Sequence, residues 1–520
     1  MWNFSPVMLS MSRKASSDPA RLFLFLILAF IPLSCGSPRI PHEPETVVVA
    51  LDSSPTNLDP RIGIDKASEN FHRLMFNGLL KKDQHDRMVP DLAIRFEQAG
   101  PLLYRFVLRA GVRFHDGRVL TSADVLFTYN SILNGEVAST RRASLDSIAS
   151  VRAPAPDVVE FELREPFNGL PFNLNLGIIP AGSGVEFAAH PVGTGPYQLV
   201  RFEADRDALL ESFTAYFEGA ARTRFLKMRI IPDATTRALE LQKGGVDLVL
   251  GTGIIPPDYF RILKVDSALK TITSTGNNYA YIGFNTTDPI LKHREVRQAI
   301  AYAINREQMV QSLFYGAAEP ATGLLAPHNW AYEGNVRRFT YNPGEAMRLL
   351  DAAGYPDPDG PGPRVRFRLT HKISTNEFRR LVATVLQRNL ADVGIGVDIR
   401  SYEWGTFFSD VNRGNFQMCM LIWVGESDPD IYRNVFATSG TRNRGKYSNP
   451  DVDNWVALAK VAPTETEQIH YYSLVQKKVA EDCPYVSLWY ESNMAVFRRE
   501  LQGVRLTPGV DFAVLKDVHW

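Results

Sequence analysis

The sequence predicts an α/β fold with helices packed on a partly parallel sheet. Residues 279–284 alternate as a strand, with Tyr279 and Tyr281 on one face and Ala280, Ile282 and Phe284 on the other. After Asp288-Pro289 the spacing becomes helical, with Val296, Ile300, Ala303 and Ile304 on one side. Strand and helix patterns keep alternating to the C-terminus, which is typical of such a sheet.

Length and composition describe an ordinary globular protein with more than one domain. A chain of 520 residues is too long for one core. It is 45% hydrophobic and 22% charged, and its 57 basic and 57 acidic residues cancel. This balance gives no indication of a nucleic acid or polyanionic partner.

The N-terminus predicts export. Arg13, Lys14 and Arg21 precede the apolar run Leu22–Ile31, which is too short to span a bilayer comfortably. Cys35 follows Leu-Ser, as in a lipobox, so residues 1–35 are predicted to be a signal peptide with Cys35 as the lipidated first mature residue. The alternative is an ordinary signal peptide with an incidental cysteine. Residues 36–45 are rich in proline and are expected to form a tether.

The first half of the mature chain is predicted to contain short strands and two helices. Strands are expected at Val47–Leu51 and Leu103–Leu108. One helical pattern covers Ile64–Leu80 and ends near Gly78. Thr121 is the predicted N-cap of the next helix, with Asp124 at its third position.

The second half carries clear helix start and stop signals. Asn305, with Gln308 three residues later, predicts a capping box, and Asn342-Pro343 begins another helix. An amphipathic helix over residues 378–393 stops at Gly394. Residues 395–399 then alternate as a strand.

Three segments together resemble one protein family. They are residues 279–310, the segment Leu108–Leu133 (LRAGVRFHDGRVLTSADVLFTYNSIL) and Pro191–Tyr197 (PVGTGPY). Their sequences and their order along the chain resemble those of the bacterial extracellular solute-binding proteins of family 5, which are peptide-binding lipoproteins of ABC importers.

This resemblance implies a two-lobed periplasmic-binding-protein fold with an extra domain inserted in lobe one. Lobe one would take residues 46–70, 192–284 and 491–520, the insert residues 71–191, and lobe two residues 285–490. The lobes would close on a ligand by a hinge motion.

Motifs for catalysis are missing from the sequence. It contains no HExxH, GxSxG, CxxC or GxGxxG, and the histidines lack metal-ligand spacing. Residues 440–447 come close to a P-loop, but Tyr447 replaces the hydroxyl residue that holds magnesium. No cofactor or metal is therefore predicted. Cys419 and Cys483 could form a disulfide, but two buried thiols are favoured.

The resemblance places the ligand-binding acid in the segment after Trp423. In peptide-binding members an acidic residue here pairs with the α-ammonium of the peptide, and Glu426 matches it by position, although the family residue is usually Asp. Asp428 is the second candidate. The alternative for both acids is capping of a turn at Asp428-Pro429.

Aromatic and backbone contacts are also implied by the resemblance. Trp404 and Trp423 match positions that wall side-chain pockets, although packing in the core is the alternative. Ala67 and Ser68 belong to a loop that offers backbone hydrogen bonds to an extended peptide in relatives. Tyr279 and Tyr281 are more typical of core packing.

The predicted function is that of a monomeric, exported and lipid-anchored binding protein, which captures di- or oligopeptides and delivers them to an ABC permease. The same fold could instead bind nickel, haem, an opine or an oligosaccharide. An alternative of another class is a secreted hydrolase, but the sequence contains no set of catalytic residues for one. A third possibility is a sensor or chaperone without a permease.

Overall fold

A computed structural model describes residues 43–360 and 362–520. The predicted signal peptide, Cys35 and most of the tether lie outside these residues. Among the described residues, no helix has both the length and the apolar character needed to cross a membrane.

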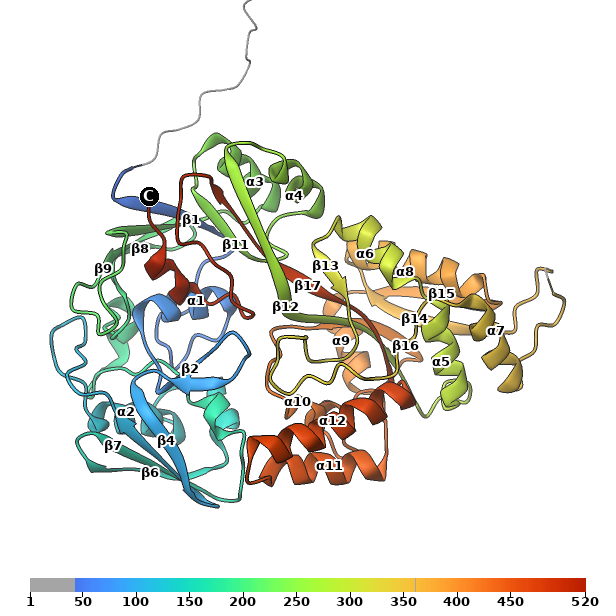
Figure 1. The fold of residues 1–520 in the computed structure, drawn as a ribbon, viewed down its shortest axis with the longest axis horizontal. Coiled ribbons are helices and arrows are strands. Elements are labelled where there is room, and N and C mark those ends of the chain that lie inside the picture. Colours follow the sequence, from blue (N-terminus) through green and yellow to red (C-terminus); the bar gives the residue numbers. More distant parts are fainter. Residues whose placement is uncertain (1–42, 361) are drawn as a thin grey trace, which may run out of the picture. The chain divides into compact units, whose positions relative to one another are not determined.

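The main element is an eleven-stranded mixed sheet (Figure 1). Its strands, in spatial order, are β15 (Ile395–Tyr402), β14 (Phe367–Ser374), β16 (Met418–Trp423), β12 (Leu269–Phe284), β17 (Tyr485–Arg498), β11 (Leu248–Thr252), β1 (Thr46–Leu51), β10 (Phe225–Ile230), β9 (Asp207–Ser212) and β8 (Tyr197–Glu203). The short β13 (Ala318–Pro320) pairs with β17. Because β1 is parallel to β10 and β11, and β14 to β15 and β16, the predicted partly parallel sheet is confirmed.

Strands β12 and β17 connect the two ends of this sheet. Residues Leu269–Thr275 of β12 pair with the half of β17 that also pairs with β11. Residues 279–284 pair with β16. Between Thr275 and Tyr279 the register shifts: β12 advances four residues while β17 advances two, from Ser492 to Tyr490. This β-bulge separates the part of β12 near β11 from the part that pairs with β16.

Two smaller sheets lie within residues 71–191. One has four antiparallel strands in the order β4 (Ala93–Gly100), β5 (Leu103–Leu108), β7 (Val158–Leu163) and β6 (Ile148–Ala155). The other is the hairpin of β2 (Leu80–Lys82) and β3 (Met88–Pro90). The four-stranded sheet has its own apolar core, together with α2 (Ser122–Leu133).

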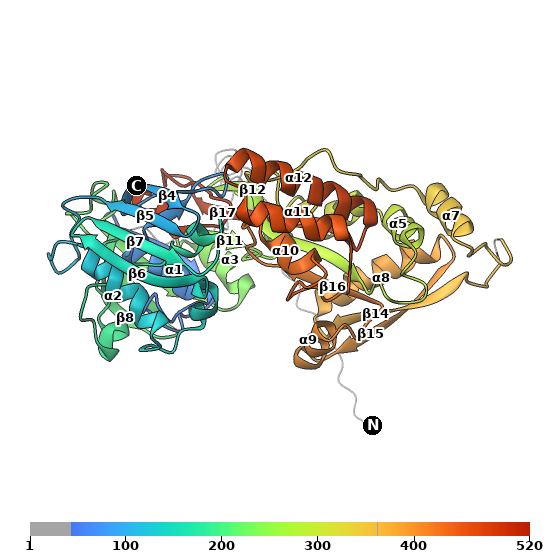
Figure 2. The ribbon, with the colours of Figure 1, turned by 90° about the horizontal axis from the view of Figure 1, so that it is seen from below.

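Eleven further α-helices pack around the sheets in the described residues. Before β12 they are α1 (Lys66–Met75), α3 (Ala234–Lys243) and α4 (Pro257–Lys264). After β12 they are α5 (Arg294–Ala303), α6 (Arg306–Phe314), α7 (Pro343–Ala352), α8 (Glu377–Ala391), α9 (Trp404–Asn412), α10 (Ile431–Phe436), α11 (Pro450–Val461) and α12 (Glu465–Asp482). Helices α11 and α12 lie side by side (Figure 2). The 3-10 helices are η2 (Thr140–Leu145), η3 (Leu170–Asn173), η4 (Val185–Ala189) and η5 (Phe512–Asp517).

The two faces of β12 enter different cores, as its alternation predicts. Ala280, Ile282 and Phe284 lie in the core under α5 and α8. Tyr279 and Tyr281 lie in a second core with α10 and α12, and both are almost fully buried. Both predicted N-caps are confirmed: Asn305 accepts from Gln308 N–H and Asn342 from Glu345 N–H. The full capping box expected at Asn305 does not form, because the Asn305 N–H donates to Asn389 Oδ1 instead of Gln308.

The helix expected over residues 64–80 is shorter than predicted. It is α1, Lys66–Met75, because Asp65 caps it by accepting the Ser68 N–H and because Phe76 is already extended. In the Pro191–Tyr197 segment, glycine also allows a close contact between two backbone segments. A Cβ on Gly193 would lie 1.9 Å from the Met75 carbonyl oxygen, so the close approach of two backbones requires glycine there.

The cysteines of the described residues are free. Cys419 and Cys483 are both buried thiols, as favoured from the sequence. Burial raises the pKa of each thiol to about 12.

Candidate functional site

The loop from Val424 to Asp430 connects β16 to α10 and carries both predicted acids. Glu426 is partly buried, and its Oε1 lies 3.2 Å from Nη1 of Arg442. Burial raises the pKa of Glu426, while the charges of Arg442 and Lys82 oppose that rise. Lys82 itself donates to Ser427 Oγ at 2.6 Å. Glu426 is thus a carboxylate beside two cations of the protein.

Asp428 forms a local turn. Its Oδ1 accepts the N–H of Asp430 at 2.9 Å, which is the turn-forming arrangement that the sequence left open as an alternative to ligand contact. Burial, reinforced by repulsion from Asp430, raises the pKa of Asp428 to about 7.

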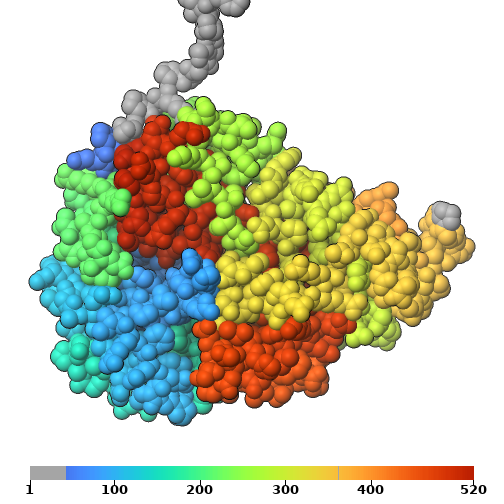
Figure 3. Space-filling view, viewed as in Figure 1, coloured from blue at the N-terminus to red at the C-terminus, as the bar shows by residue number. Residues whose placement is uncertain are grey.

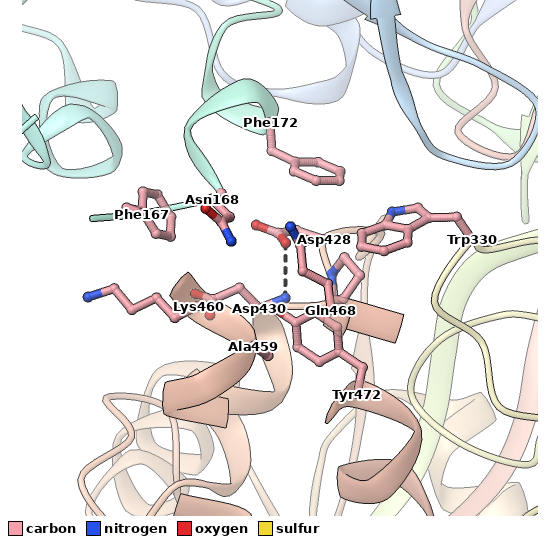
Figure 4. A pocket seen from close by; sticks show the side chains of 12 residues that line it. Phe167, Asn168, Phe172, Trp330, Asp428, Asp430, Ala459, Lys460, Gln468 and Tyr472 are labelled. Carbon is pink, nitrogen blue, oxygen red and sulfur yellow. Dashed lines mark hydrogen bonds between the residues drawn. The ribbon is translucent and has the colours of Figure 1, made fainter. Parts of the chain in front are cut away.

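Asp428 also faces a narrow seam (Figure 4). Phe167, Asn168 and Phe172 approach from the segment around η3, Trp330 from the segment after β13, and Tyr472 from α12. The free space is about 10 Å³, close to the smallest volume that holds one water molecule. This seam is too small to be the place of a peptide.

Trp423 is covered on the side facing the 440–445 loop. Its ring stacks with Tyr281 at 6.3 Å between centroids, and the guanidinium carbons of Arg442 and Arg444 lie 5.6 and 4.9 Å from its centroid. Trp423 is only 7% exposed. A ligand would therefore reach its ring only after the arginines move.

Trp404 is open to solvent. Strand β15 ends at Tyr402 and Trp404 begins α9, because Glu403 caps that helix by accepting the N–H groups of Gly405 and Thr406. Its side chain is 47% exposed and stacks on Phe408. It offers an aromatic surface, as a pocket wall requires.

Arg379 is a residue that sequence reasoning missed. Its guanidinium carbon lies 5.2 Å from the Trp404 ring centroid, and its Nη1 is buried without a hydrogen-bond partner among the described residues. Burial lowers the pKa of Arg379, which the charge of Glu491 opposes. A cation with an unused donor beside an exposed aromatic ring can hold a carboxylate.

Ala67 and Ser68 lie in the first turn of α1 instead of a loop. Both are buried, and the N–H and hydroxyl of Ser68 donate to the carboxylate of Asp65 at 2.9 and 2.6 Å. The Ser68 hydroxyl also accepts the N–H of Asn57. The polar groups of Ser68 are thus occupied within the protein.

The β12 bulge brings further polar groups to the acidic loop. Asn278 Oδ1 accepts the Gly425 N–H at 3.0 Å, and Asn278 Nδ2 donates to Glu491 Oε2 at 2.8 Å. Burial raises the pKa of Glu491, while Asn278 and Arg379 oppose that rise. No motif in the sequence marks these residues, because β12 and β17 are brought together only by the fold.

The β2–β3 hairpin contacts Asn277 and residues 328–330. The buried carboxylate of Asp86 accepts from Nδ2 of Asn277 and Nδ2 of Asn329, and His328 Nε2 lies 3.2 Å from it. Trp330 N–H donates to the His85 carbonyl. Figure 3 shows the blue segment that contains the hairpin against the yellow segment that contains residues 328–330.

No group of three or more His, Cys, Asp or Glu side chains suited to a metal ion occurs within residues 43–360 and 362–520. The buried histidines have structural surroundings: burial lowers the pKa of His72 to about 3 and of His115 and His371 to about 4.

A family model matches most of the chain. Residues 87–444 match the model described as bacterial extracellular solute-binding proteins, family 5 Middle. Among curated proteins, the oligopeptide-binding protein AppA of Bacillus subtilis is 28% identical over 498 residues, which cover 91% of each chain.

Solved structures agree with this match. AppA of Bacillus subtilis, solved in complex with a nonapeptide, aligns with a TM-score of 0.71 at 27% identity and covers 92% of this chain and 99% of its own. NikZ of Campylobacter jejuni, solved in complex with Ni(L-His), aligns with a TM-score of 0.73 at 24% identity, covering 92% and 100%. The second likeness shows the fold alone.

Proposed function

The chain belongs to the bacterial extracellular solute-binding proteins of family 5, and from this premise we propose that it captures peptides between its two lobes and delivers them to an ABC permease. One observation carries the ligand class: the similarity to oligopeptide-binding AppA extends over nine-tenths of both chains, and the solved AppA structure holds a nonapeptide. Members of this family are transport components, so the hydrolase alternative is set aside.

In this proposal Glu426 receives the α-ammonium of the peptide. Glu426 is partly buried. A carboxylate in such surroundings interacts more strongly with a positive group than it does in water, and leaving it without a partner costs free energy. Asp428 remains the second candidate, although its carboxylate already closes a turn.

The other contacts of the proposed site come from three elements. Trp404 provides an exposed aromatic wall, with Trp423 behind the arginines of the 440–445 loop. Arg379, beside Trp404, supplies the cation for a peptide carboxylate. Ala67 would contribute its backbone N–H, which has no intrahelical acceptor in the first turn of α1, and Ser68, whose polar groups bond within the protein, would hold this turn in place.

A second candidate function is binding of a metal complex, which NikZ exemplifies in the same fold. Nickel held by a small chelator would not need three protein ligands, so the scattered histidines do not decide between the two ligand classes.

The test is denaturing mass spectrometry of small molecules carried by the protein, produced without residues 1–35 and purified gently. A ladder of short peptides of mixed sequence supports the proposal. A single non-peptide species would overturn the peptide class, and a chelator–metal complex would favour the second candidate.

We further infer that the exported protein is a monomer held at the membrane by lipid on Cys35. The inference rests on the basic and apolar segments before Cys35 and on the Leu-Ser-Cys sequence. Replacing Cys35 with Ser should release the protein from the membrane fraction. Unchanged membrane association would rule out this anchor.

A further inference from the structure

The C-terminal end of α4 exposes apolar side chains. Phe260 and Leu263 of this helix are buried in the core, whereas Ile262 is 45% and Val265 is 82% exposed. Of the large apolar side chains whose exposure the structure describes, Val265 is the most exposed. Single exposed apolar side chains are common on proteins, so the surroundings of these two decide what they can bind.

Cations without ion pairs surround these side chains. Arg261, Lys264 and, at the start of β12, Lys270 are exposed, and none of them forms an ion pair within the described residues. The guanidinium carbon of Arg261 lies 5.7 Å from the ring centre of Tyr315, which is itself 46% exposed. Asp266, the acid of the same segment, is half-buried and accepts a backbone N–H at 2.9 Å. We call the surface formed by Arg261, Ile262, Lys264, Val265 and Tyr315 the α4 patch.

The α4 patch lies near the end of the sheet at which the first strand begins. One row of paired residues crosses from β1 to β12, and it consists of Val49, Leu248, Phe497 and Lys270. Strands β1 and β12 run in the same direction, because β1 is parallel to β11 while β17 is antiparallel to both β11 and β12. The residues before Val49 and those before Lys270 therefore lie beyond the same end of this row. Three strand spacings, about 14 Å, separate the two positions.

A short connection joins this end of the sheet to the lipid anchor proposed at Cys35. Residues 36–45 span at most about 35 Å when they are fully extended. The anchor would thus keep the start of β1, and the α4 patch with it, close to the lipid surface. Confinement of this kind raises the effective concentration of a surface at the membrane, so that weak contacts suffice.

We propose that the α4 patch contacts the surface of the membrane and binds anionic phospholipid headgroups. Apolar side chains among Lys and Arg are the combination with which peripheral proteins enter the headgroup region, because the apolar groups leave water while the cations meet the phosphates. Such a small contact is reversible, so the protein can leave the lipid surface to reach its permease. The inference goes beyond peptide binding, since no residue of the α4 patch belongs to the proposed ligand site.

The experiment measures sedimentation of the processed protein, produced without residues 1–35, with vesicles of phosphatidylcholine that contain 30% phosphatidylglycerol. We expect binding that falls by about fivefold or more on vesicles of phosphatidylcholine alone, because the attraction of the cations is then lost. The double variant Lys264→Glu/Val265→Asp should bind the anionic vesicles about tenfold or more weakly than the wild-type protein.

A matched control is the double variant Lys292→Glu/Leu381→Asp. Lys292 is exposed and without an ion pair among the described residues, and Leu381 is 50% exposed on α8. The control thus makes the same change in net charge and apolar surface away from α4, and it should bind vesicles as the wild-type protein does. Both double variants should keep the wild-type melting temperature, since all four side chains are exposed.

Equal binding of the two double variants overturns the proposal, as does equal binding of the wild-type protein to neutral and anionic vesicles. A wild-type protein that binds no vesicle overturns it as well and leaves the α4 patch to a protein partner. The proposed function is measured separately, as peptide binding in the absence of lipid. It can fail while the α4 patch binds lipid, and it can hold while the patch does not.

Discussion

Asn278 donates a hydrogen bond of 2.8 Å from Nδ2 to Oε2 of Glu491, across the bulge between β12 and β17. The Oδ1 atom of the same side chain accepts the N–H of Gly425, directly before the proposed ammonium-binding acid. One amide therefore joins both long strands to the loop that carries Glu426. The position of this loop depends on the conformation of the bulge.

Replacement of Asn278 with Ala should lower both stability and ligand affinity. The change leaves the partly buried carboxylate of Glu491 without its amide donor, which costs about 1 kcal/mol, and it frees the exposed Gly425 N–H to bond water, so the loop loses its tie to β12. Urea unfolding of the variant measures this loss. Asn335→Ala, at an exposed position, is the control and should change stability little. Equal unfolding midpoints for both variants would contradict the bridging role.

Replacement of Glu426 with Ala should weaken binding of peptides with a free amine by about tenfold or more, because a charge-assisted contact is lost. N-acetylated forms of the same peptides should be affected far less. Titration calorimetry with each pair measures the difference. Glu345→Ala removes another acid that pairs with an arginine, far from the loop, and should leave binding unchanged. Equal losses for free and acetylated peptides would remove the ammonium role.

Replacement of Asp428 with Asn should stabilise the protein at neutral pH. The folded-state pKa of about 7 lies above the unfolded value near 4, so the folded protein prefers the neutral acid. Its contribution is fully present below about pH 4 and is lost as the pH rises to about 7. Asn is uncharged and can still accept the Asp430 N–H.

The gain from Asp428→Asn should therefore be small at pH 4.5 and reach about 1–3 kcal/mol at pH 8. Urea unfolding of both proteins at the two pH values measures it. A gain of the same size at both values would show that the charge of Asp428 is not its cause.

Replacement of Gly193 with Ala should prevent correct packing of α1 against the Pro191–Tyr197 segment. The added Cβ would lie 1.9 Å from the Met75 carbonyl oxygen, and backbone cannot move aside as a side chain can. We expect a loss of about 3 kcal/mol or more, or little soluble protein. Gly184→Ala is the control, since a Cβ there meets nothing within 4 Å. Similar yields and melting temperatures for the two variants would contradict this explanation.

Local features of the fold could be predicted from the sequence because they depend on neighbouring residues. Thr121 with Asp124, and Asn305 with Gln308, cap their helices through contacts three residues apart. The alternation of β12 likewise decides which side chains enter which core. The limit of α1 was less predictable, because its apolar pattern continues beyond Phe76, where the backbone becomes extended.

The candidate site could be predicted only in part. The position of Glu426 follows from the order of motifs along the chain. Its partner Arg442 lies in the next loop, and the charge of Lys82, hundreds of residues earlier, also acts on Glu426. Arg379 and Glu491 show the same limit. They lie on different elements, and only the folded chain brings Arg379 near Glu491 and Glu491 to the Asn278 side chain that bonds the acidic loop. The domain boundaries and the roles of the site residues remain predictions.

The bulge in β12 separates two hydrogen-bond ladders that each keep a constant register on their own side, apart from one further shift at Ala280. The residues at the bulge are not held in either ladder. Rotation of one part of the sheet against the other would therefore change a few φ and ψ angles at the bulge and break few ladder hydrogen bonds. A solute-binding protein that bends at this bulge would keep both hydrogen-bond ladders intact in its open and its closed state.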